Sequence, residues 1–278
     1  MGRVSFAGGC IGMSVPPRPL IPGNMTVGST FTFGKYQVES EDPWPIEWEI
    51  VHQTDEYQIA QTKQIIDLRA FDAKEANDPD KYMYRKENGN NNWQYSNIKQ
   101  FLNSDQATWY SAQHQYDAPP NSSNVSNNTP YDSHKGFLYY FSDEEKSLLR
   151  DMEFDLQHSL DGSYTWTGQV WLPTLTQMVG WENGHRSEGT QFSKYTDNAS
   201  RCKTLHENCT KYNPYCLAQN YASGREFWYW MSSEYFDPYG TDVYIVPADG
   251  NLEIDATCSS ANDGSGGLAP CIRLPLHA

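Results

Sequence analysis

The chain has 278 residues, and its 35 acidic against 20 basic residues give it a formal net charge of −15. Such a surface repels phosphate backbones, and no cluster of lysine and arginine offsets it, so we expect no nucleic-acid partner. No apolar run is long enough to cross a bilayer, so we also expect no membrane insertion. The 14% aromatic content, with 9 Trp and 19 Tyr, predicts a core of rings in a loop-rich fold that contains strands.

The first 28 residues suit neither a helix nor a buried strand, because they contain a Gly8-Gly9 pair and four prolines. We predict that residues 1–28 form an extended attachment arm that docks on a neighbouring subunit; a disordered terminus is the alternative. Prolines stand where a secretory signal has its apolar stretch, so we expect synthesis in the cytoplasm.

Residues 28–68 alternate between apolar and polar side chains, beginning with Phe31 and Phe33. This period of two predicts a meander of three or four antiparallel strands. The polar, asparagine-rich run 87–92 interrupts the pattern. Residues 95–102 then place their apolar side chains on one face of a short helix.

Capping signals predict two further helices. Ser142 with Glu145 three residues later makes a capping box, so a helix is expected from about Asp143 to Asp151. Another short helix should follow Pro173 with Thr174 as its cap. The Pro-, Asn- and Ser-rich run 118–129 predicts a surface loop or insertion.

The stretch 180–225 is polar and irregular, as expected of long loops on a rigid scaffold. Cys202, Cys209 and Cys216 are evenly spaced within it, and His206 lies between the first two. Three thiolates and an imidazole could hold Zn²⁺ in a tetrahedral site, although the close Cys-x-x-Cys pair of many zinc sites is missing. Isolated thiols are the alternative, and six cysteines also permit disulfides of unassigned connectivity.

The closing segment 227–275 begins with an aromatic cluster in which Trp228 and Trp230 are predicted core residues. A strand is expected from Asp242 to Pro247, followed by a turn at Asp249-Gly250 and a second strand. After a glycine-rich loop over 262–267, the chain should end on a strand over 271–275.

Five segments in order resemble the bacterial and phage domain of unknown function 6273 family, over roughly residues 28–276. They are Thr32-Phe-Gly-Lys-Tyr36 with Pro45-Ile-Glu-Trp-Glu-Ile50, the run from Asn92 to Asn103, Phe141-Ser-Asp-Glu-Glu-Lys146, Val170-Trp-Leu-Pro-Thr-Leu-Thr176, and the closing segment. Two departures stand out: Trp230-Met-Ser-Ser233 lacks the arginine and proline of the family strand, and Leu274 separates Arg273 from Pro275.

The same layout is similar to the formylglycine-generating-enzyme variant of the C-type lectin fold, a scaffold on which phages display binding loops. The resemblance implies an α+β domain over 29–278 with mostly antiparallel strands, short helices and long loops, behind the arm 1–28. It also implies a non-enzymatic virion protein of a bacteriophage or phage-like particle, in an oligomer or larger assembly. Its partners would be other virion proteins, reached through residues 1–28, and a host-surface glycan or protein.

The rival interpretation is an enzyme of the formylglycine-generating or sugar-modifying type. Formylglycine chemistry needs two reactive cysteines late in the domain, where Cys258 and Cys271 lie. They flank strands expected to be neighbours, so a structural disulfide or two buried thiols is the preferred interpretation. The sequence has no hydrolase elbow, phosphate loop or His-Glu-x-x-His motif, and no catalytic residue is predicted.

The predicted ligand contacts lie in the closing hairpin and loop, because tyrosines give displayed loops a large contact area at low entropy cost. We expect Tyr235 and Tyr239 to be an exposed pair. The predicted ligand-binding residues are Tyr235, Tyr239, Asp242, Asn262 and Asp263. No cofactor is required, but Asp237, Asp249 and Asp255 are candidate oxygen ligands for Ca²⁺, with ordinary turn chemistry as the alternative.

Overall fold

A computed structural model describes residues 21, 25–79, 84–180, 188–236, 239–252 and 258–276. The predicted arm over 1–28 lies almost wholly outside these residues. Position 21 and positions 25–28 are described, and among them Ile21 and Met25 are buried in the core, at 0% and 8% exposure. The domain therefore begins to pack before residue 29.

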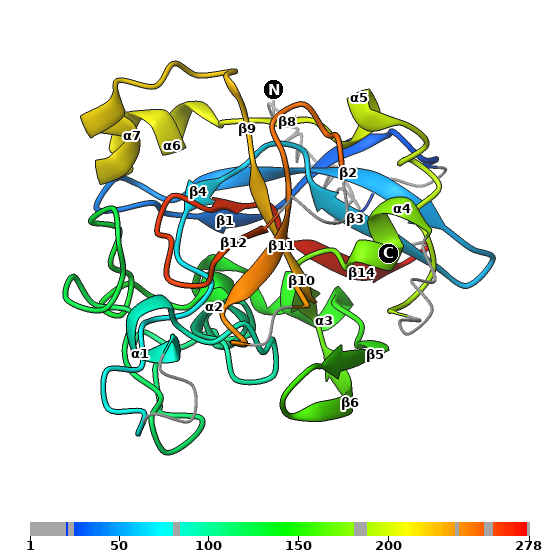
Figure 1. The fold of residues 1–278 in the computed structure, drawn as a ribbon. Coiled ribbons are helices and arrows are strands. Elements are labelled where there is room, and N and C mark those ends of the chain that lie inside the picture. The colour runs from blue at the N-terminus through cyan, green and yellow to red at the C-terminus, as the bar shows by residue number, and fades with distance from the viewer. Residues whose placement is uncertain are drawn as a thin grey trace, which may run out of the picture.

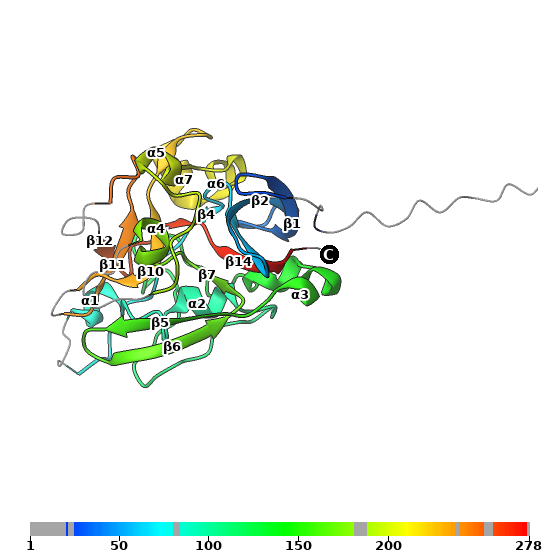
Figure 2. The same cartoon turned by 90° about the vertical axis from the view of Figure 1, so that its right-hand side faces the viewer.

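Two five-stranded sheets form the body of the described domain. The first is antiparallel throughout and has the order β1 (Thr30–Tyr36), β2 (Trp44–Gln53), β3 (Tyr57–Thr62), β14 (Cys271–Pro275), β7 (Val170–Trp171). The second has the order β12 (Cys258–Ser260), β11 (Asp242–Val246), β10 (Tyr229–Glu234), β13 (Gly267–Leu268), β4 (Asp67–Leu68), with β10 and β13 parallel. In Figure 2 the two sheets lie on opposite sides of the molecule, with β10–β12 facing β1, β2 and β14 across the core.

Two antiparallel two-stranded sheets flank these sheets, and the helices are all short. The pairs are β5 (Met152–His158) with β6 (Gly162–Gly168), and β8 (Lys203–Thr204) with β9 (Glu226–Phe227). The helices are α1 (Arg85–Asn88), α2 (Asn97–Leu102), α3 (Asp143–Leu148), α4 (Leu175–Val179), α5 (Asn198–Arg201), α6 (Glu207–Tyr212), α7 (Pro214–Gln219) and a 3-10 turn η1 (Phe137–Tyr140). The fold is thus α+β with mostly antiparallel strands, as predicted (Figure 1).

Local signals placed the starts of the two capped helices correctly. The Ser142–Glu145 capping box starts α3, and Thr174 starts α4 through a second capping box. Helix α3 ends at Leu148 rather than near residue 151, because the next residue is extended and Arg150 pairs with Arg273 of β14. Pairing with a distant strand overrode the local helical tendency.

The stretch 180–225 differs from the prediction of an irregular loop, because its described part contains α5, β8, α6 and α7. Asp197 caps α5 through a capping box, and Asn213 caps α7 with Pro214 at the first helical position. These are ordinary start signals that the polar composition obscured. Figure 1 shows this segment as a layer along one edge of the domain.

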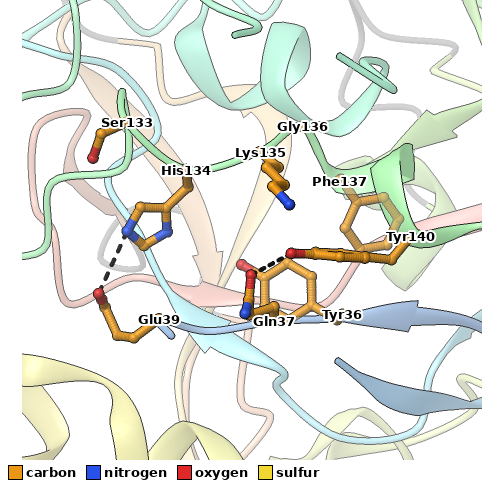
Figure 3. Close-up of a pocket in the computed structure, with 9 residues that line it drawn as sticks. All are labelled: Tyr36, Gln37, Glu39, Ser133, His134, Lys135, Gly136, Phe137 and Tyr140. Atoms are coloured by element: carbon orange, nitrogen blue, oxygen red, sulfur yellow. Dashed lines mark hydrogen bonds and ion pairs between the residues drawn. The ribbon is translucent and has the colours of Figure 1, made fainter. Parts of the chain in front are cut away.

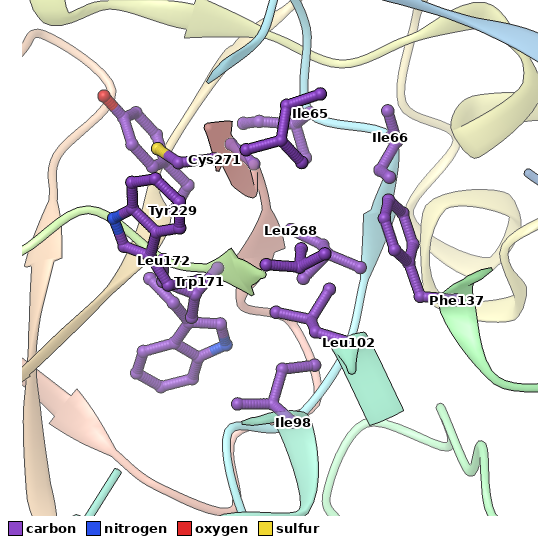
Figure 4. Close-up of a cluster of buried hydrophobic side chains, with 14 of the residues drawn as sticks. Ile65, Ile66, Ile98, Leu102, Phe137, Trp171, Leu172, Tyr229, Leu268 and Cys271 are labelled. Carbon is purple, nitrogen blue, oxygen red and sulfur yellow. The ribbon is translucent and has the colours of Figure 1, made fainter. Parts of the chain in front are cut away.

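The core is built from rings and aliphatic side chains of both sheets and α2. Figure 4 shows Ile98 and Leu102 of α2 beside Trp171 and Leu268, while Tyr229 lies near Cys271. Trp230 is fully buried, which confirms its predicted place in the core. The chain passes from β3 to β4 and back from β13 to β14, so both crossings join the sheets covalently through the core.

The closing segment forms the expected strands, but these strands belong to different sheets. Asp242–Val246 is β11, and Gly250 in the following turn has a φ of +70°, which suits glycine. However, β12 pairs with β11 in the second sheet, whereas β14 pairs with β3 and β7 in the first. The strands that carry Cys258 and Cys271 are therefore not neighbours, and both cysteines are free thiols.

Candidate functional site

Three exposed rings gather at the end of the β10–β11 hairpin. Phe236 and Tyr239, in the connection between these strands, are 71% and 48% exposed, and Tyr84 before α1 is 37% exposed. The rings of Tyr84 and Tyr239 are in contact, with centroids 4.2 Å apart. We call Tyr84, Phe236 and Tyr239 the ring cluster. Exposed apolar side chains that form one contiguous patch, unlike single exposed rings, often mark a contact surface.

Tyr235 does not belong to the exposed set. Its side chain is half-buried against the core, and its ring meets that of Tyr244 edge to face at a centroid distance of 5.2 Å. The expectation of an exposed Tyr235–Tyr239 pair is therefore wrong for Tyr235. Phe236 is exposed in its place; it lies beyond Glu234, where β10, which is buried at every position, ends.

A buried histidine joins the ends of two strands close to the ring cluster. His158, the last residue of β5, has its Nε2 atom 3.1 Å from Glu234 Oε2 at the end of β10. Its Nδ1 atom lies 3.1 Å from Asp161 Oδ2. Both ring nitrogens thus face carboxylate oxygens. The interaction with His158, the hydrogen bond from Asn92 and the charge of Arg85 lower the pKa of Asp161 well below its ordinary value, so this carboxyl group is ionised.

Arg85 links this carboxylate to the ring cluster. Its Nη2 atom is 3.3 Å from Asp161 Oδ2, and its Nε donates to the carbonyl of Gly240 over 3.4 Å. Arg85 follows Tyr84 in the chain and Gly240 follows Tyr239, so one guanidinium fixes both sides of the ring cluster. The Asp161 side chain is 31% exposed and offers acceptor oxygens at the edge.

The asparagine-rich run forms the base of the site. Asn90, Asn91 and Asn92 are all buried, although the sequence there is strongly polar. Asn91 Nδ2 donates to the carbonyl of Asp242 over 2.8 Å, and Asn92 Nδ2 donates to Asp161 Oδ2 over 2.9 Å. These bonds hold the start of β11 and the β5–β6 turn together. A rigid polar base therefore supports the exposed rings.

The other predicted ligand contacts are engaged within the protein. Asn262 Nδ2 donates to the carbonyl of Glu87 over 2.6 Å, and Asp263 Oδ1 accepts from Asn127 Nδ2 over 2.6 Å. Asp242 Oδ1 accepts from the Ser260 hydroxyl over 3.3 Å. The glycine-rich loop 262–267 is thus hydrogen-bonded to the segment 118–129. The role of Asp242, Asn262 and Asp263 in ligand binding stays a prediction.

The predicted calcium ligands are only partly described. Asp237 and Asp255 lie outside the described residues. Asp249 is exposed, and its Oδ1 atom accepts from the backbone N–H of Asn251 over 3.0 Å, as in an ordinary aspartate turn. The described residues contain no group of three or more His, Cys, Asp or Glu side chains arranged to hold a metal ion.

The four predicted zinc ligands, Cys202, His206, Cys209 and Cys216, do not all lie together in the structure. Cys209 and Cys216 are both buried, with their sulfur atoms 3.6 Å apart. The His206 ring instead stacks on Trp44 at a centroid distance of 4.0 Å, and its Nδ1 atom caps α6. The Cys202 sulfur donates to the carbonyl of Asn198 over 3.5 Å. The structure therefore brings together only two of the four residues.

The late cysteines of the enzyme interpretation lie in different environments. Cys271 is fully buried, and burial raises the pKa of its thiol well above the ordinary value, so it stays protonated at neutral pH. Cys258 is half-buried, and its sulfur lies 3.7 Å from Asp242 Oδ2. A protonated thiol in an apolar core is a poor nucleophile.

A second polar site lies where β1 meets the segment 133–140 (Figure 3). The Nδ1 atom of His134 is 3.0 Å from an Arg69 nitrogen, and its Nε2 atom is 3.5 Å from Glu39 Oε2. Because a guanidinium only donates, Nδ1 accepts and Nε2 directs its hydrogen at Glu39. The cavity beside them has a volume of about 130 Å³, well below that of ordinary ligand pockets. We regard it as a polar junction between segments.

Sequence reasoning missed His158, Asp161 and Glu234. Two signals were available: residues 152–158 alternate between apolar and polar side chains, which predicts a strand, and Asp161 precedes a glycine that turns the chain into β6. A histidine at an inward position of such a strand needs buried partners. Its partner Glu234 comes from a strand far along the chain, which no local pattern indicates.

Comparison with known proteins gives a family. Residues 59–276 match the model of the family described as Domain of unknown function (DUF6273), and the chain belongs to this family. No curated protein and no solved structure gives a significant match. Among the described residues, no helix has the length and apolar character needed to span a membrane.

Proposed function

We propose that this member of the Domain of unknown function (DUF6273) family is a non-enzymatic virion protein that binds a host-surface glycan through the ring cluster. One observation carries the binding part: Phe236 and Tyr239 are exposed beside an ionised carboxylate on a rigid polar base. The virion part rests on the resemblance to scaffolds that phages use for display. That resemblance also supports a C-type-lectin-like arrangement of the α+β fold and an attachment role for residues 1–28.

The size of the ring cluster favours a glycan over a protein partner. A specific protein interface takes about 800 Å² from each partner and usually 20 to 30 residues a side. The ring cluster has three rings, backed by buried polar groups. A few rings can cover the apolar face of a sugar, while a carboxylate at the edge accepts hydrogen bonds from its hydroxyls and a tyrosine hydroxyl accepts or donates them. Asp161, with its low pKa, is the acceptor placed for this role.

The polar network beneath the rings favours tight binding, because it fixes the side chains of the site in advance. A side chain that is already fixed loses little conformational entropy when a ligand binds. Arg85 holds the carboxylate of Asp161 and the carbonyl of Gly240, so both sides of the site are ordered before a ligand arrives. Binding then needs no rearrangement of the described strands.

A glycan microarray probed with the labelled full chain tests this proposal. Replacing Phe236 and Tyr239 together by alanine should reduce binding to the preferred glycan by about tenfold or more, since 1.4 kcal/mol corresponds to tenfold. Tyr139→Ala is the matched control, because this tyrosine is 39% exposed but lies on η1. All variants should keep their stability within ~0.5 kcal/mol.

Equal binding by the double variant and the wild type would remove the ring cluster as the binding surface. The rival enzyme interpretation has its own test, which is mass spectrometry of a co-expressed substrate. A cysteine converted to formylglycine in that substrate would contradict a non-enzymatic role.

A further inference from the structure

Two cysteine thiols meet between helices α6 and α7. The sulfur atoms of Cys209 and Cys216 are 3.6 Å apart, and both side chains have 0% exposure. Both are free thiols in the structure. Seven positions separate them in the chain, so a bond between them would close a short loop around the junction of the two helices.

Asn213 fixes the two helices relative to the second sheet. Its Oδ1 atom accepts from the backbone N–H groups of Tyr215 and Cys216 at 3.0 and 3.2 Å, which starts α7. Its Nδ2 atom donates to Asp67 Oδ1 over 2.8 Å and to the carbonyl of Leu68 over 3.1 Å. The residue is fully buried. The two thiols are therefore held together by the packing of the helix pair against β4.

We propose that Cys209 and Cys216 are a modification site that a peroxide or a small disulfide oxidises to an intramolecular disulfide. The two thiols lose two protons and two electrons as the sulfur–sulfur bond forms. Hydrogen peroxide takes them up and leaves two water molecules; a small disulfide is instead reduced to two thiols. A disulfide has its sulfurs about 2.05 Å apart, so the pair must close by about 1.5 Å, which side-chain rotation can supply.

The environment of Cys209 makes this reaction slow, as expected of a structural pair. Burial, the hydrogen bond with Cys216 and the negative charge of Asp67 all raise the pKa of the Cys209 thiol well above its ordinary value. The thiolate, which is the attacking form, is therefore scarce at neutral pH. Oxidation should accelerate as the pH rises. These features distinguish the pair from a catalytic dithiol, whose thiolate is stabilised.

The sequence allows a direct test, because Lys211 lies between the two cysteines. The folded full chain is incubated with oxidised glutathione at mildly alkaline pH, denatured, alkylated and cleaved with trypsin. Fragments 204–211 and 212–225 should appear joined, with the loss of two hydrogen atoms. Reduction before alkylation should separate them into two alkylated fragments. The oxidised chain should also melt at a temperature higher by on the order of 5 °C.

Two cysteine variants test which thiols form the disulfide. Cys202→Ala should still give the joined fragments, because the sulfur of Cys202 contacts the carbonyl of Asn198. Cys216→Ala should leave Cys209 singly alkylated. Recovery of both wild-type fragments as separate alkylated peptides, under conditions that cross-link the urea-unfolded chain, would overturn the proposal. A cross-link from Cys209 to any other cysteine would overturn it as well.

Discussion

Replacing Trp230 by alanine should destabilise the domain more than any exposed aromatic replacement. Its side chain has 0% exposure, and its Nε1 atom donates to the carbonyl of Arg69 over 2.8 Å. Its ring meets those of Trp228 and Phe71 at centroid distances of 5.0 and 5.9 Å. The substitution therefore removes packing between β10 and the segment that follows β4, and also removes a buried hydrogen bond.

Two contributions set the loss of unfolding free energy that we expect for Trp230→Ala. Truncating a buried tryptophan to alanine costs about 3 to 5 kcal/mol of unfolding free energy, depending on how far the cavity collapses. Within that loss, leaving the Arg69 carbonyl without its donor contributes about 1 to 3 kcal/mol. Trp230→Phe separates the two contributions, because it keeps a ring in the core but removes the N–H donor. We expect Trp230→Phe to cost less than Trp230→Ala.

Equilibrium unfolding in urea measures these losses. With a urea dependence of about 3 kcal/mol per molar, the expected loss for Trp230→Ala lowers the midpoint by about 1 to 1.7 M. Tyr239→Ala, at 48% exposure, is the control and should change the unfolding free energy by no more than ~0.5 kcal/mol. Similar small shifts for both variants would show that the assignment of buried and exposed rings is mistaken.

Two further predictions concern buried contacts. Burial alone would lower the pKa of His114, but its hydrogen bond and ion pair with Glu75 outweigh burial and raise the pKa. The contribution of protonated His114 to the unfolding free energy is therefore complete below pH about 6.5, and it disappears as the pH rises through the folded pKa. The stability difference between the wild type and His114→Asn, measured by urea midpoints across this range, should shrink with rising pH, and a constant difference would contradict the ion pair. Gly266→Ala should cost about 1 to 3 kcal/mol, because an added Cβ would lie 1.8 Å from Trp230 Nε1, and an unchanged melting temperature would contradict this close approach.

Local patterns in the sequence were sufficient for the elements whose causes are local. The capping box of Ser142 starts α3, Thr174 starts α4, and the alternation that begins at Phe31 gives the first strands. Each depends on hydrogen bonds or side-chain directions within a few residues, so the chain specifies them wherever they end up in the fold. Trp230 was also predictable, since a large ring in a strand pattern belongs in the core.

The assignment of strands to sheets depended on contacts between distant segments. The sequence places β12 and β14 close together, yet β12 joins the second sheet and β14 joins the first. Strand pairing is decided by backbone hydrogen bonds and by which apolar faces can be buried together, and neither is visible in the spacing of residues. The expected proximity of Cys258 and Cys271 was incorrect for this reason.

The candidate site shows the same division. The sequence predicted ligand contacts in the closing hairpin, which stay a prediction, and expected Tyr239 to be exposed, as it is in the structure. Only the tertiary structure placed Tyr84 against it and brought His158 and Asp161 from the β5–β6 hairpin to Glu234 at the end of β10. Charged groups can be buried only beside partners, and those partners lie far away in the sequence because the chain must return several times to build one closed core.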